Sequence, residues 1–129
     1  MLQLAALIAS LAATASPQHC PARTMGPGSL HRGGTAGAIC MLAAFGLACR
    51  PATYTLSAFG VDTAHVETFR TRRLAGGRCG VVVVQTFRVV PQPPHVLSHH
   101  TCTRLRKTAT GVVAGRCTPA ATVSLTELR

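Results

Sequence analysis

The chain has 129 residues, which is the size of a single domain. Hydrophobic residues make up 47% of it and charged residues 12%, and so apolar a composition excludes a chain that is disordered throughout. The formal net charge of +10 at pH 7 predicts attraction to polyanions such as nucleic acid, acidic polysaccharide or anionic lipid headgroups. Because the basic residues are spread along the chain, the alternative is a positively charged surface that has no partner.

The chain begins with two apolar segments that have the features of export signals. Residues 2–15 form an apolar stretch that ends in an Ala-x-Ala pattern at Ala13 and Ala15, typical of a signal peptide and its cleavage site. A second apolar stretch, residues 35–49, follows Met25 and offers a cleavage site before Cys49. Three interpretations compete: a signal that starts at Met1 and leaves the second stretch as a buried helix, translation that starts at Met25, or one long bipartite signal.

We predict cleavage before Cys49. Cleavage after Ala15 would leave a uniformly apolar helix in the mature protein, and we expect a domain of this size to be unable to bury such a helix on all sides. Residues 1–48 are therefore predicted to be an export signal region, a helical signal or anchor. Residues 49–129 then form a small domain that is secreted or attached to the cell envelope. An alternative for Cys49 itself is lipid attachment, as in bacterial lipoproteins.

The cysteines predict disulfide bonds, because an exported protein with an even number of cysteines usually pairs them. Four remain after residue 48, and they allow three connectivities between which the sequence does not choose. A bridge from Cys102 to Cys117 would close a loop the size of a hairpin, and one from Cys49 to Cys79 would stabilise the first half of the domain. The alternative is a set of reduced, buried cysteines.

The part after residue 49 has the pattern of β-strands and no convincing amphipathic helix. Residues 81–90 (VVVVQTFRVV) give the strongest strand prediction and are expected to lie in the centre of a sheet. The loop 91–94, which contains three prolines, ends that strand. The pattern predicts an all-β fold, a small antiparallel sandwich or barrel-like domain. The other candidate strands are residues 53–61, 65–72, 95–105, 110–117 and 121–128.

A local cluster of His95, His99, His100 and Cys102 has the right residue types for a metal site. On a regular strand, His95 and His99 face one way while His100 and Cys102 face the other. We therefore predict surface histidines on an edge strand, with no metal site and no cofactor.

Two short basic runs are the candidate anion-binding residues. They are expected to hold phosphate or sulfate groups, and because no aromatic residues lie between the arginines, base stacking is not supported. The predicted function is a non-enzymatic binding module, with a polyanion or an anionic membrane surface as its partner. The runs consist of Arg70, Arg72, Arg73, Arg104, Arg106 and Lys107.

Two alternatives to this function remain open. The first is a small secreted nuclease or toxin in which His65, Glu67 and the arginines that follow supply an acid, a base and a phosphate clamp. No residue is assigned a catalytic role, because three residue types in one strand are easily met by chance. The second is an unselected reading frame without function, because most of the common residues have GC-rich codons. The coherent strand patterns argue against this second alternative.

Overall fold

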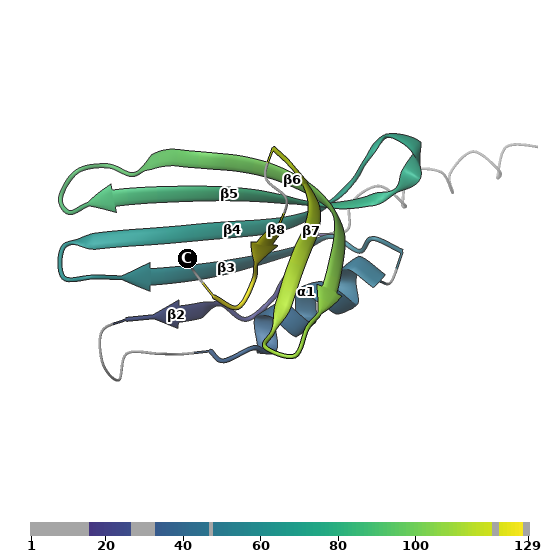
Figure 1. Ribbon diagram of the computed structural model, residues 1–129, viewed down its shortest axis with the longest axis horizontal. Coiled ribbons are helices and arrows are strands. Elements are labelled where there is room, and N and C mark those ends of the chain that lie inside the picture. Colours follow the sequence, from purple (N-terminus) through teal and green to yellow (C-terminus); the bar gives the residue numbers. More distant parts are fainter. Residues whose placement is uncertain (1–15, 27–32, 47, 120–121, 128–129) are drawn as a thin grey trace, which may run out of the picture.

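The computed structural model describes residues 16–26, 33–46, 48–119 and 122–127 (Figure 1). This part of the chain is mostly β-sheet, as predicted, with one α-helix, α1 (Ala36–Gly46). The strands are β1 (Gln18–His19), β2 (Arg23–Met25), β3 (Ala52–Phe59), β4 (Thr63–Arg73), β5 (Cys79–Val89), β6 (His95–Lys107), β7 (Val112–Thr118) and β8 (Thr122–Ser124). A short 3₁₀ turn, η1 (Ala75–Gly77), joins β4 to β5.

The described strands form a single sheet in the order β1-β3-β4-β5-β6-β7-β8, and β2 also pairs with β3. Strands β3 to β8 are an antiparallel meander, whereas β1 and β2 run parallel to β3. The strand β5 lies in the middle of the sheet, as its continuous apolar run predicted. The sheet curves, with α1 on its inner side (Figure 1). We call the side that faces α1 the concave face and the opposite side the convex face. The sequence predicted an all-β sandwich or barrel-like domain. The described strands form one curved sheet, which excludes a sandwich of two separate sheets.

The hydrophobic core lies on the concave face. Tyr54, Phe69 and Val83 are register partners on neighbouring strands, and at most 1% of each is exposed. The rings of Tyr54 and Phe69 pack with their centroids 5.6 Å apart. Met41 of α1 is fully buried in the same cluster. A Cβ atom on Gly37 would collide with the Pro21 carbonyl and the Tyr54 ring, so glycine is needed for the close approach of α1.

The helix α1 packs one of its sides against the sheet, although the sequence suggested that so small a domain could not bury it on all sides. The buried side consists of Gly37, Ala38, Met41 and Ala44. Its exposed positions are mostly alanine and glycine, with Ile39 at 39% exposure, so little apolar area is left in water. The size argument against this helix therefore does not hold. Among the residues that the structure describes, no helix is long and apolar enough to cross a membrane.

All six cysteines are paired in three disulfides. Cys49–Cys79 and Cys102–Cys117 are the two bridges considered from the sequence. The third bridge, Cys20–Cys40, joins the segment after β1 to α1, and the sequence did not predict it. Each bridge stabilises a small domain by roughly 2–4 kcal/mol. The sulfur of Cys49 is used in its bridge, so that bridge and a lipid on the same sulfur exclude each other.

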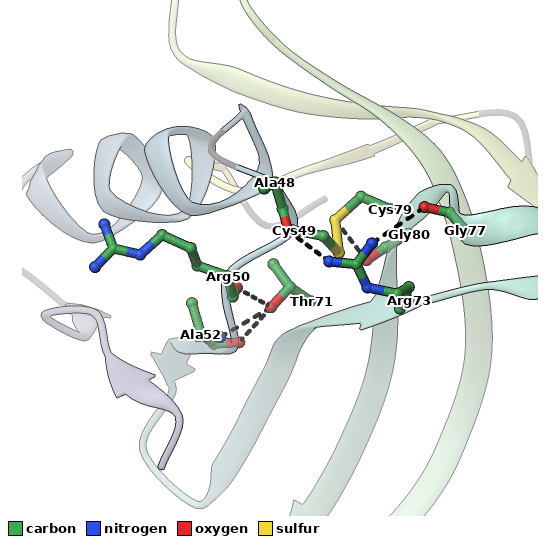
Figure 2. Close-up of a disulfide and its surroundings, with 9 residues drawn as sticks. All are labelled: Ala48, Cys49, Arg50, Ala52, Thr71, Arg73, Gly77, Cys79 and Gly80. Carbon is green, nitrogen blue, oxygen red and sulfur yellow. Dashed lines mark hydrogen bonds between the residues drawn. A yellow bond between two sulfur atoms is a disulfide. The ribbon is translucent and has the colours of Figure 1, made fainter. Parts of the chain in front are cut away.

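Hydrogen bonds around the Cys49–Cys79 bridge hold the end of α1 to the sheet (Figure 2). The Thr71 hydroxyl donates to the carbonyl of Arg50 at 2.7 Å and accepts from the amide of Ala52 at 2.8 Å. Thr71 is buried, and these two bonds satisfy its hydroxyl. The chain that leaves the helix is thereby aligned with the start of β3.

Candidate functional site

The first candidate site is a group of arginines on the outer side of the sheet. On β4, Arg70 and Arg72 are exposed and alternate with the buried Phe69 and Thr71. On β6, Arg104 and Arg106 are exposed on either side of the buried Leu105. All four guanidinium groups therefore point away from the core. Lys107 follows them at the exposed end of β6.

Arg104 and Arg106 lie on the outer side because the alternation of buried and exposed positions along β6 shifts by one residue. The buried positions Cys102 and Leu105 are three residues apart, and the pairing with β7 is interrupted at Thr103. The facing residue of β7, Arg116, has a left-handed backbone with φ 50°. Without this slip, both arginines would share the buried face with Cys102.

The exposed Arg73 is bonded to the chain that follows α1, a contact that the sequence did not suggest. Its guanidinium donates to the carbonyl of Ala48 at 2.8 Å and to that of Gly77 at 3.5 Å (Figure 2). It thereby joins the end of β4 to the chain that follows α1. We therefore define the basic face as Arg70, Arg72, Arg104 and Arg106.

None of the three acidic residues of the chain lies on the basic face. Asp62 is in the turn between β3 and β4, at the far end of the sheet from Arg72. Glu67 points to the concave face, and Glu127 belongs to the C-terminal segment that crosses that face.

The second candidate site is a row of polar side chains on the concave face. Glu67, Gln85 and Ser98 are register partners on β4, β5 and β6. The Ser98 hydroxyl donates to the Gln85 side-chain oxygen, and the Gln85 side chain hydrogen-bonds the Glu67 carboxyl. Burial raises the pKa of Glu67 to about 7, and the hydrogen bond from Gln85 offsets part of this rise. Only 3% of Glu67 is exposed, and its Oε2 atom has no hydrogen-bond partner.

The histidines of β6 do not face the way that the sequence predicted. A β-bulge near Leu97 shifts the register between β5 and β6, so His95 pairs with Phe87 while His100 pairs with Val83. His95 and His100 consequently share the concave face, and His99 is exposed on the other side. A single inserted residue, which alternation alone does not reveal, reverses the expected facing of His95.

The concave histidines occupy two places. His65 and His95 flank the ring of Phe87, with centroid distances of 5.1 and 5.9 Å. His100 is only 7% exposed, and its Nδ1 atom has no hydrogen-bond partner. In the described part of the chain, no group of three His, Cys, Asp or Glu side chains lies close enough together to hold a metal ion.

A cavity of about 370 Å³ opens between the concave face and the C-terminal segment. The Tyr54 hydroxyl donates to the Leu125 carbonyl at 2.9 Å, and the Leu125 amide donates to the Val112 carbonyl at 2.9 Å. These bonds hold the segment across the sheet, where Figure 1 shows β8 in front of the central strands. The cavity is lined by Glu67, Gln85, His100, Thr110, Val113, Thr122, Val123, Ser124, Thr126 and Glu127.

The residues proposed for a nuclease are divided between the two faces. His65 and Glu67 share the concave face, as the sequence predicted. Arg70 and Arg72 lie on the convex face, so a phosphate held there would be separated from Glu67 by the thickness of the sheet. The cavity was not apparent from the sequence, because Glu67, His100 and the C-terminal hydroxyls are far apart along the chain.

Comparisons with protein-family models, with curated proteins and with solved structures found no match for this chain.

Proposed function

We propose that this protein is an exported, disulfide-stabilised β domain that binds anionic surfaces through its basic face. The observation that carries the proposal is the placement of four exposed arginines on the side of the sheet that holds none of the acidic residues. Guanidinium groups form paired hydrogen bonds with phosphate and related anions, which favours them over a diffuse positive charge.

Three disulfides support export, because such bonds persist in oxidising compartments. The packing of α1 and the Cys20–Cys40 bridge support the alternative in which the signal is the first apolar stretch. That stretch, residues 2–15, lies outside the described residues. We therefore propose a mature chain that begins near Ser16 and keeps α1 in its core. The sequence-based choice of cleavage before Cys49 would remove this helix.

A salt titration with duplex DNA and a heparin column tests the binding. The R70Q/R104Q variant should elute from heparin at lower salt than the wild type. With DNA, the dependence of the logarithm of affinity on the logarithm of salt should become shallower by about two. The R50Q/R88Q variant is the matched control, because it removes the same charge from exposed positions away from the four arginines of the basic face. Arg50 precedes β3, and Arg88 lies on the convex face six residues along the strands from Arg70. Equal losses in both variants would show a non-specific effect of net charge and would contradict the proposal.

An anionic membrane surface is the second candidate partner, and one observation favours it. Exposed apolar side chains gather where the β3–β4 and β5–β6 turns lie together, joined by a hydrogen bond of 2.8 Å from the Val90 amide to the Asp62 carbonyl. Val61 is 95% exposed there. Co-sedimentation with vesicles of phosphatidylserine and phosphatidylcholine distinguishes the two partners. A V61D variant that still binds heparin but no longer sediments would favour the membrane.

A further inference from the structure

The concave cavity has the opposite electrostatic character to the rest of the chain. Glu67 and Glu127, two of the three acidic residues of the chain, line it. No described Lys or Arg does so, although the chain carries a formal net charge of +10. The basic face and this cavity therefore attract different ligands.

Two buried polar atoms in this cavity lack a protein partner. Glu67 Oε2 belongs to a side chain that is 3% exposed, and His100 Nδ1 to one that is 7% exposed. Buried polar groups are almost always hydrogen-bonded, and leaving one unsatisfied is destabilising. Both residues line the same cavity, so the two unpartnered atoms belong to side chains that border one space.

We propose that this cavity binds a small organic cation that carries a primary ammonium group, with the ammonium on the Glu67 carboxylate. An ammonium group has three N–H donors. Glu67 Oε2 supplies a charged acceptor, and Nδ1 of His100 can accept in the tautomer that leaves this nitrogen without a proton. Thr126 lines the same space. Val113 and Val123 contact the carbon chain of such a ligand.

The lining argues against other classes of ligand. An anion would be repelled by the carboxylates and would find no arginine or lysine among the described residues of the lining. Quaternary ammonium ligands are held by aromatic cages, and no Phe, Tyr or Trp of the described chain lines this cavity. A cation beside Glu67 also favours its ionised form. Since burial raises the pKa of Glu67 to about 7, the carboxyl is easily converted to that form near neutral pH.

Three probes of matched length test the proposal on the full disulfide-bonded protein. They are n-butylamine, 1-butanol and butyrate, which differ only in the terminal group. We expect the amine to shift the NMR signals of the His100 ring and of the Ser124 and Thr126 amides in a saturable way. The alcohol should bind about tenfold more weakly or not at all, and butyrate should not bind. Equal binding of amine and alcohol, or no saturable binding of the amine, would overturn the proposal.

Variants identify the group that binds the ammonium. E67Q keeps the shape of the side chain and should weaken amine binding about tenfold or more, because it removes the charge. D62N is the matched control, because it removes one negative charge from the exposed β3–β4 turn and should bind like the wild type. Equal weakening in both variants would overturn the assignment to Glu67.

A third variant covers the case in which E67Q does not fold. Thr110 is exposed and lines the cavity from the β6–β7 turn, so T110F should narrow the opening without disturbing the core. We expect T110F to lose amine binding while heparin elution stays unchanged. Normal amine binding in T110F would show that the ligand lies elsewhere. Because heparin binding depends on the convex face, the two proposals succeed or fail independently.

Discussion

The two faces of the sheet differ in burial and in charge. Val83 on the concave face is fully buried, whereas its neighbour Val82 on the convex face is half-buried. The same alternation along β4 buries Glu67 beside the concave cavity and places Arg70 in solvent. Strand geometry thus turns a single run of residues into two surfaces of opposite charge. The comparison teaches that residues adjacent in one strand belong to different surfaces of this fold.

Two irregularities in strand β6 help to determine which side chains lie on which face of the sheet. The bulge near Leu97 brings His95 to the concave face, and the slip at Thr103 brings Arg104 to the outer side. Each shifts the facing of every later residue of its strand by one position. The charge distribution therefore depends on two local departures from regular pairing as well as on composition.

The largest expected effect comes from removing the cover of the concave face. A chain that begins at Cys49 lacks α1 and exposes the buried rings of Tyr54 and Phe69. We expect it to unfold without cooperativity in urea, whereas a chain that begins at Ser16 should unfold in one cooperative transition. The protein recovered outside the cell is correspondingly expected to begin at Ser16 by mass spectrometry. Cooperative unfolding of the shorter chain would restore the cleavage point before Cys49.

A smaller effect separates the two faces within one strand. Val83→Ala should lower the free energy of unfolding by about 2–3 kcal/mol, because it leaves a cavity in the core. Val82→Ala makes the same chemical change on the convex face and should cost less than about 1 kcal/mol. Urea denaturation of both variants gives the comparison. Equal losses of unfolding free energy in the two variants would mean that the convex face is also covered in solution.

A third prediction concerns the pH dependence of stability. The pKa of Glu67 is raised from 4.5 to about 7 by burial, so the folded state keeps a proton that the unfolded state releases between these values. The stabilisation is complete below about pH 4.5 and is lost as the pH rises to about 7, by about 1–3 kcal/mol after allowance for screening. The stability of E67Q should change less with pH than that of the wild type across this window. The stability of D62N should still fall as the pH rises. Parallel curves for wild type and E67Q would show that other groups cause the fall in stability.

Local patterns in the sequence were enough for much of the fold. Five strands after residue 50 were predicted within a few residues, because β-branched runs and prolines determine where strands begin and end. Two cysteine pairs suggested from loop size are bridged. The strands β1 and β2 were missed, because two or three polar residues carry no periodic signal.

Two parts of the candidate sites required the structure. The basic runs were visible as composition, whereas the hydrogen bond from Arg73 to the carbonyl of Ala48 was not. The acidic cavity joins Glu67 to the hydroxyls of the C-terminal segment, some 60 positions away in the printed sequence. Contacts of this range depend on how the sheet curves, which no local pattern reports.

The sequence by itself determined that this is a basic, cysteine-rich chain dominated by short strands, because propensity and composition are local properties. Only the tertiary structure decided that the apolar helix at residues 36–46 belongs to the core. A helix with one buried side needs a concave partner, and that partner is built from strands later in the chain. The tertiary structure also decided which charges share a face. One bulge between β5 and β6 and one interrupted pair between β6 and β7 are sufficient to move a side chain to the other face of the sheet.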